Sequence, residues 1–126
     1  MNAYNENGKK HGPWENYWDN GNPMYKENYV NGKLHGPWED YYFYGNLNNK
    51  GNYVNGKMNG LWEIYYPNGN LKYKVNLLNN KKHGVMKNYF SDGMLSNKVN
   101  YINGNMHGLS EKYNSKGKLT IKKYYI

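Results

Sequence analysis

The chain has 126 residues, of which 17% are aromatic, and its formal net charge is +8 at pH 7. Low hydropathy with high net charge is typical of disordered chains, but those are poor in aromatic residues, so we expect a folded protein. The absence of cysteine excludes disulfides and thiolate metal ligands. No basic and apolar leader follows Met1 and no apolar run approaches the about 18 residues of a membrane span, so we expect a cytoplasmic protein.

One pattern recurs along the chain with a period of 24 residues. The stretch WENYWDNGN begins at Trp14, WEDYYFYGN at Trp38 and WEIYYPNGN at Trp62. We divide the chain into a partial repeat at 1–11, four repeats at 12–35, 36–59, 60–83 and 84–107, and a terminal partial repeat at 108–126. This division leaves no room for a second domain.

Each repeat contains two turn signals, Asn20-Gly21 and Asn31-Gly32 in the first. Asn-Gly tolerates positive φ at both residues, so we predict tight two-residue turns of type I′. The later equivalents are Tyr44-Gly45, Asn68-Gly69, Asp92-Gly93 and Lys116-Gly117 for the first signal, and Asn7-Gly8, Asn55-Gly56, Asn79-Asn80 and Asn103-Gly104 for the second. These turns leave strands of about 11 and 9 residues, which are near the usual strand length. The predicted fold is therefore all-β, an elongated single-sheet solenoid or meander of stacked β-hairpins with about five repeats.

The turns predict which residues lie opposite each other. A turn at Asn20-Gly21 places Glu15 opposite Lys26 and Trp18 opposite Pro23. The same turn pairs Asn16 with Tyr25, and the turn at Asn31-Gly32 pairs Tyr29 with Leu34 and Tyr25 with Trp38. Because side chains alternate along a strand, aromatic residues collect on one face and a glutamate row faces a lysine row on the other.

A helical alternative rests on the spacing of Trp14, Tyr17 and Trp18. The helix would have to fit between glycines about nine residues apart, which is too short for stability. We therefore favour strands.

Two sets of residues recur at fixed places in the repeat, one expected in the core and one expected to contact a partner. The tryptophans and the glycines that open each repeat are expected to form the repeat core: Trp14, Trp38, Trp62, Gly12, Gly36, Gly60, Gly84 and Gly108. The evenly spaced tyrosines and lysines of the charged face are the candidate partner-binding residues: Tyr17, Tyr41, Tyr65, Tyr89, Tyr113, Lys26, Lys50, Lys74, Lys98 and Lys122. The lysines also have a simpler interpretation as a solvated face that keeps the sheet soluble.

No constellation of residues indicates catalysis. Residues one repeat apart lie two strands apart, about 9.6 Å, so the repeated histidines are too far apart to share a metal ion. The glutamates face lysines, and there is no nucleophile elbow or phosphate-binding loop. We expect no enzyme activity, no metal, no cofactor and no small-molecule substrate.

The unit G-x-W-E-x-Y-x-x-x-G, followed by x-L-x-x-K-x-N-Y-x-N-G-K-x-H-G, resembles the MORN repeat, and more closely its bacterial variant, the MORN-2 type. NGKLHGPWEDYY and NGKMNGLWEIYY carry the resemblance, whereas NLLNNKKHGVMKNYF departs from it because Met86 replaces tryptophan. The resemblance implies an elongated stack of hairpins that binds or scaffolds partners without catalysis. Bacterial examples are often the antitoxin, or immunity, half of a toxin–antitoxin pair, and other members have been proposed to bind phospholipid or to dimerise.

Three functions compete. The first is an immunity protein that covers an acidic toxin or effector, since positive charge speeds encounter with an acidic protein. The second is attachment to an anionic membrane surface, and the third is binding of single-stranded nucleic acid. The absence of arginine argues against the third, and no amphipathic helix supports the second. We favour the first, with homodimerisation through edge strands left open and the repeat containing Met86 expected to be specialised or flexible.

Overall fold

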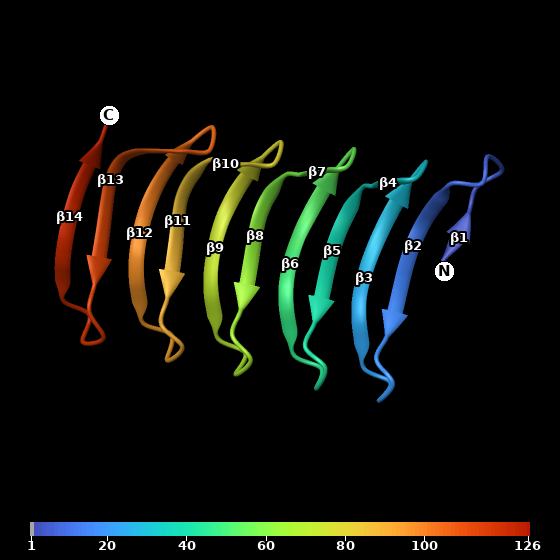
Figure 1. Cartoon of the computed structure of the whole chain (residues 1–126), viewed down its shortest axis with the longest axis horizontal. Helices are drawn as coiled ribbons and strands as arrows, with labels where there is room; N and C mark the ends of the chain where they lie inside the picture. Colours follow the sequence, from blue (N-terminus) through green and yellow to red (C-terminus); the bar gives the residue numbers. More distant parts are fainter. Residues whose placement is uncertain (1) are drawn as a thin grey trace.

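The computed structural model describes residues 2–126, which form one open antiparallel sheet of 14 strands (Figure 1). Successive hairpins follow each other in chain order, and three short strands, β4, β7 and β10, each pair only with the strand before them. The strands are β1 (Ala3–Tyr4), β2 (Lys10–Tyr17), β3 (Pro23–Val30), β4 (Lys33–Leu34), β5 (Gly36–Tyr41), β6 (Leu47–Val54), β7 (Lys57–Met58), β8 (Gly60–Tyr65), β9 (Leu71–Leu78), β10 (Lys81–Lys82), β11 (Gly84–Tyr89), β12 (Leu95–Ile102), β13 (Asn105–Tyr113) and β14 (Leu119–Tyr125). The predicted all-β meander of hairpins is confirmed.

The turns at one end of the hairpins differ from the prediction. The Trp18 N–H donates to the Asn22 carbonyl at 2.7 Å, and the Gly21 N–H donates to the Trp18 carbonyl at 2.9 Å. Gly21 has positive φ (88°) but Asn20 does not. This geometry is the three-residue loop that combines a type I turn with a left-handed glycine. The prediction of two-residue turns at this end is wrong, because a single positive φ is sufficient for the longer loop.

The longer loop also changes the pairing beside it. Glu15 lies opposite Lys26 as predicted, but Tyr17, rather than Trp18, lies opposite Pro23. The register shifts between Asn16 and Tyr17, which marks a β-bulge. Trp18 therefore lies outside the strand.

At the opposite end the two-residue turns are as predicted. Asn31 and Gly32 both have positive φ (49° and 82°), and Asn79 and Asn80 keep the same conformation without glycine (48° and 72°). Asn7-Gly8 differs, because only its glycine has positive φ.

Beyond the two-residue turn, the returning strand is interrupted after two residues in three repeats, whereas β13 runs on without a break. In the first repeat His35 separates β4 from β5, and Gly36 has positive φ (111°). The interruption moves the register by two positions, so Tyr25 lies opposite Asp40 rather than the predicted Trp38. Since the shift is an even number of residues, the predicted separation of the two faces survives. The paired segments are also shorter than predicted, at eight and six residues in the first full repeats.

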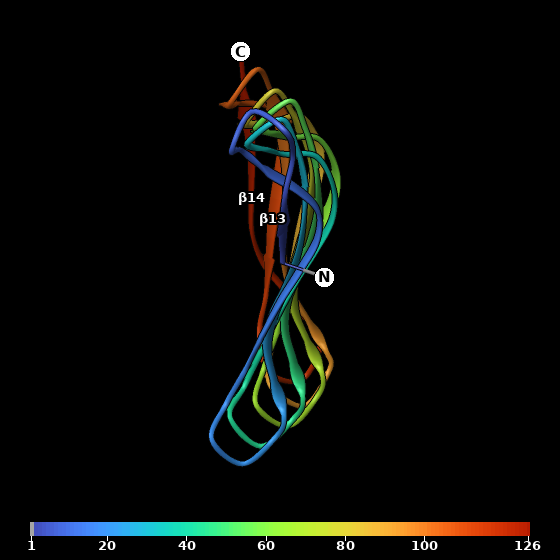
Figure 2. The ribbon, with the colours of Figure 1, turned by 90° about the vertical axis from the view of Figure 1, so that its right-hand side faces the viewer.

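The sheet is a single twisted layer, as the edge-on view in Figure 2 shows. Its buried core is small and lies on the face that carries the tryptophans, hereafter the tryptophan face. Trp62, Val75 and Met86 are buried, and Trp38 and Tyr53 are among the half-buried residues that pack against them. The segment around Met86, which we expected to be specialised or flexible, therefore contributes to the core.

Side chains also link each repeat to the next through the turns. His35 Nδ1 accepts the N–H of Asn55 at 3.1 Å, and Asn59 Oδ1 accepts the N–H of Asn79 at 3.0 Å. Asn59 occupies the position of His35 one repeat later. These histidine and asparagine side chains hold turns in place. Residues 2–126 contain no helix that could span a membrane.

Candidate partner-binding surfaces

The second face of the sheet, hereafter the charged face, carries a row of glutamates and lysines that alternate from strand to strand. Lys26 lies between Glu15 and Glu39, and Lys50 lies between Glu39 and Glu63. Opposite charges directly across strands stabilise a sheet by about 0.2–1 kcal/mol for each pair. In the N-terminal repeats each central lysine is thus compensated on both sides.

The predicted tyrosine row lies on the charged face beside these glutamates. The Tyr17 hydroxyl donates to Glu15 Oε2, and Lys26 Nζ lies 5.8 Å from the centre of the Tyr41 ring. Burial, followed by the charge and hydrogen bond of Glu39, raises the pKa of Tyr41 to about 12. Burial and Glu63 likewise raise the pKa of Tyr65. These tyrosines therefore stabilise the face by engaging its carboxylates.

The alternation of charge breaks at Lys87. Lys87 stands where the other repeats have glutamate, and it lies opposite Lys74 on β9 and Lys98 on β12. All three side chains are half-buried. Like charges directly across strands destabilise a sheet. The predicted residues Lys74 and Lys98 thus meet in a cluster with Lys87, which was not among the predicted site residues.

Lys122 on β14 lies opposite Glu111 on β13, and Lys98 on β12 lies opposite the same glutamate from the other side. The five predicted lysines are therefore not equivalent. Lys26 and Lys50 each have two glutamate neighbours, whereas Lys74 and Lys98 each have one glutamate and Lys87.

Charge is also distributed unevenly between the two halves of the chain. Residues 1–63 contain six lysines and seven acidic residues, for a net charge of −1. Residues 64–126 contain eleven lysines and two acidic residues, for a net charge of +9. The net positive charge of the protein therefore resides entirely in its C-terminal half. Counting the charged residues along the sequence reveals this difference between the halves, which the total net charge does not show.

On the tryptophan face the Trp62 ring leans over the preceding repeat. A Cβ on Gly51 would lie 2.0 Å from a Trp62 ring atom, so the ring covers the Gly51 backbone. The Trp62 ring stacks on Trp38 (5.5 Å between centroids, 22° between planes) and meets the edge of Tyr53 at 5.6 Å. The structure places Trp62 in the core and Trp14 and Trp38 in half-buried positions. The glycines that open the repeats all have positive φ: Gly12, Gly36, Gly60, Gly84 and Gly108.

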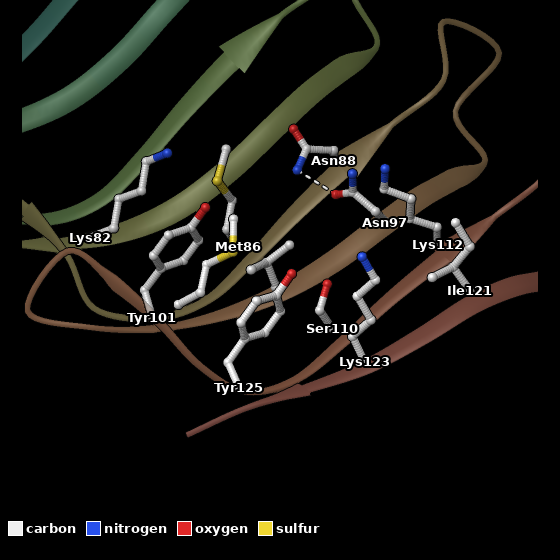
Figure 3. Close-up of a pocket in the computed structure, with 12 residues that line it drawn as sticks. Lys82, Met86, Asn88, Asn97, Tyr101, Ser110, Lys112, Ile121, Lys123 and Tyr125 are labelled. Carbon is white, nitrogen blue, oxygen red and sulfur yellow. Dashed lines mark hydrogen bonds between the residues drawn. The ribbon is translucent and has the colours of Figure 1, made fainter.

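The row of tryptophans stops before the C-terminal end of the sheet, where the face is hollowed. Moving two repeats, or 48 residues, beyond Trp38, Gly51, Tyr53 and Trp62 leads to Met86, Val99, Tyr101 and Ser110. These four residues line a groove of about 300 Å³ between β11 and β14 (Figure 3). Ser110 stands where Trp62 stands two repeats earlier, and Val99, in the position of Gly51, contributes its side chain to the wall of the groove.

The walls of the groove combine apolar and polar groups. Asn88 Nδ2 donates to Asn97 Oδ1 at 2.6 Å, and Lys82 Nζ lies 5.0 Å from the centre of the Tyr101 ring. No lining residue is acidic. The remaining lining residues are Met106, Lys112, Ile121, Lys123 and Tyr125. Sequence analysis missed this groove, although Ser110 in a tryptophan position was its signal.

The described part of the chain, residues 2–126, contains no group of three or more His, Asp or Glu side chains that could hold a metal ion. His11 and His35 accept backbone N–H groups of Asn31 and Asn55. The described residues offer surfaces for binding, and the lining of the groove contains lysines without a carboxylate.

A family model described as a MORN repeat variant matches residues 10–31, 58–79 and 82–103, which is just over half of the chain. A search of curated proteins found no match. MORN repeat proteins are generally non-enzymatic repeat modules. With its period, its hairpins and these three matched segments, the chain belongs to the MORN repeat variant family.

Proposed function

We propose that this chain is a non-catalytic binding module that holds an acidic protein partner on its C-terminal half. The observation that carries the proposal is the net charge of +9 in residues 64–126 against −1 in residues 1–63. Both halves are built from the same hairpin, so the fold itself does not require this difference. Positive potential on one region speeds encounter with an acidic partner and suppresses wrong partners.

Clusters of lysines on both faces of the C-terminal half support the same location for the partner. On the charged face Lys74, Lys87 and Lys98 repel one another across adjacent strands. A departure from a locally favourable pattern without structural gain is expected at functional sites. Carboxylates of a partner would relieve this repulsion.

The surface is large enough for a stable complex. The described chain exposes 7910 Å², and a standard interface takes about 800 Å² from each partner. One end of the sheet can therefore supply a full interface. An elongated sheet that covers another protein needs complementary shape and charge, and no catalytic group.

The more specific form of this proposal is an antitoxin, or immunity protein, that blocks a toxin or effector by covering it. Its support is the resemblance of NGKLHGPWEDYY and NGKMNGLWEIYY to bacterial variants of the repeat that act in this way. An acidic toxin would match the basic half of this chain. Anionic lipid and single-stranded nucleic acid would be attracted by the same charge, so the test must separate the three.

The test is affinity capture from a lysate of the native source at low and moderate salt, with bound protein, lipid and nucleic acid all identified. We expect one stoichiometric acidic protein that stays bound at moderate salt and whose toxicity the chain suppresses. The Lys87→Gln variant should retain less of it than the matched Lys50→Gln variant. Recovery of lipid or nucleic acid alone, released by salt, would show that the proposal is wrong.

A further inference from the structure

We propose that the groove of the tryptophan face binds a large apolar side chain, preferably aromatic, from an acidic segment of the partner. The incoming side chain would lie beside the Val99 side chain, between Met86, Tyr101 and Ser110. This inference rests on the proposed function and specifies its chemistry.

The space for such a side chain is created by one missing tryptophan. Trp62 is only 8% exposed because its ring lies over Gly51 and against Tyr53. Ser110 is the equivalent of Trp62 two repeats later, and Val99 takes the place of Gly51, so the Val99 side chain occupies part of the space that a ring would fill and the groove is what remains. At about 300 Å³ the groove is at the small end of ligand sites, which span roughly 300–1,000 Å³, so one side chain suits it better than a large ligand.

The walls of the groove favour an apolar ring. Met86 and Val99 form its apolar part, and the rings of Tyr101 and Tyr125 border it (Figure 3). Tyr101 is placed as Tyr53 is placed beside Trp62, where the two rings meet edge to face at 86°. Such aromatic pairs stabilise a contact beyond the burial of area.

The positive charges around the groove favour a partner segment with negative charge beside the ring. Lys82, Lys112 and Lys123 all line it, and no carboxylate lies among the lining residues. Lys82 is held over the Tyr101 ring at 5.0 Å, so its ammonium group is already placed at the groove. An apolar anchor flanked by carboxylates therefore complements both the apolar floor and the lysines of the groove.

Filling the groove from within the chain gives a direct test. In the preceding repeat Met86 and Val75 are both buried in one cluster with Trp62. Position 110 lies opposite Val99 on β12, so Ser110→Met should reproduce this packing one repeat later. We expect the variant to unfold at the same temperature as the wild-type protein or higher. The Ser110→Ala variant, which leaves the groove open, is the matched control.

The probes are three acetylated and amidated peptides, Glu-Glu-Trp-Glu-Glu, Glu-Glu-Ala-Glu-Glu and Lys-Lys-Trp-Lys-Lys, titrated into the full chain and followed by NMR. Only the first combines the ring with negative charge, and it should bind at least tenfold more tightly than the other two. Its shift changes should map to Tyr101, Ser110 and Tyr125. Binding should fall at least tenfold in Ser110→Met and persist in Ser110→Ala.

The outcomes separate this inference from the proposed function. If the alanine peptide binds as tightly as the tryptophan peptide, or Ser110→Met binds as the wild type does, the groove is not the site. In that case an acidic protein captured from lysate would still support the proposed function. If the wild-type chain captures no acidic protein, the proposed function is wrong, whatever the peptide titrations show.

Discussion

The first three repeats and the last two share a backbone but differ in what their side chains leave unsatisfied. In the N-terminal region Lys26 and Lys50 lie between glutamates, and the Trp38 and Trp62 rings stack on each other. In the C-terminal region Lys87 replaces a glutamate and Ser110 replaces a tryptophan. The N-terminal repeats therefore complete their own charge pairs and aromatic row, whereas the C-terminal repeats leave both incomplete.

This difference teaches that function in a repeat protein is to be sought where the pattern fails. Each repeat contacts mainly its neighbours, so a change in one repeat alters a local surface without disturbing the whole stack. Lys87 and Ser110 lie on opposite faces of the same end of the sheet. Both departures remove a stabilising contact and expose a group that could meet a partner.

The largest expected effect comes from removing the centre of the aromatic row. Trp62→Ala should lower the free energy of unfolding by about 3–5 kcal/mol, because it deletes a buried ring and leaves a cavity. Ser110→Ala, at the equivalent position in the incomplete region, should change it by less than about 0.5 kcal/mol. Urea denaturation measures both. Equal losses would remove the distinction between the two regions.

A smaller effect is expected where the Trp62 ring covers the backbone. Gly51→Ala would place a Cβ 2.0 Å from that ring, so the ring or strand must move. Overpacking of this kind costs about 1–3 kcal/mol. Lys50→Ala, the neighbouring residue on the charged face, should cost about 0.4–2 kcal/mol through its two charge pairs, less than Gly51→Ala, and serves as the control in the same denaturation series. Similar values for the two variants would argue that Trp62 does not lean over the preceding repeat.

Restoring the alternation of glutamate and lysine on the charged face should show whether Lys87 destabilises the C-terminal region. Lys87→Glu replaces two like-charge pairs, with Lys74 and Lys98, by two opposite-charge pairs. At about 0.2–1 kcal/mol for each pair, the stability should rise by roughly 0.5–2 kcal/mol while capture of the acidic partner falls. Lys50→Glu makes the reverse change in the N-terminal region and should destabilise the sheet. A stability loss in Lys87→Glu would contradict the proposed repulsion.

The smallest effect concerns alkaline pH. Burial and Glu39 raise the pKa of Tyr41 to about 12 in the folded chain, above its ordinary value of 10. The unfolded chain loses this proton first, so the stabilisation is fully present below pH 10 and is lost as the pH rises toward about 12. Stability measured across this range should fall less steeply in Tyr41→Phe than in the wild type. An unchanged slope would place Tyr41 in an ordinary solvent environment.

Particular residues show how far the sequence predicts this molecule. The repeat, the two faces and the pairing of Glu15 with Lys26 follow from glycine spacing and strand alternation, and the structure confirms that pairing and the hairpin fold. The conformation at Asn20-Gly21 was predicted incorrectly, because Asn-Gly suits two hairpin loops of different length. The pairing of Tyr25 with Asp40 was also missed. The prediction counted residues from the turns alone, and the interruption at His35, which lies outside both turns, shifts the register.

The sequence by itself determined the period, the strands and the separation of charge from aromatic residues, because these depend on local backbone preferences and on alternation of neighbouring side chains. Tertiary structure decided the direction in which the rings lean, and therefore that Met86, Val99, Tyr101 and Ser110 enclose a groove. It also decided that Lys74 lies opposite Lys87, whereas the pairing of Lys87 with Lys98 repeats the register of Glu15 and Lys26. The contact of Lys74 with Lys87 depends on how the interrupted strand returns to the sheet, and this follows only from the register of the folded sheet.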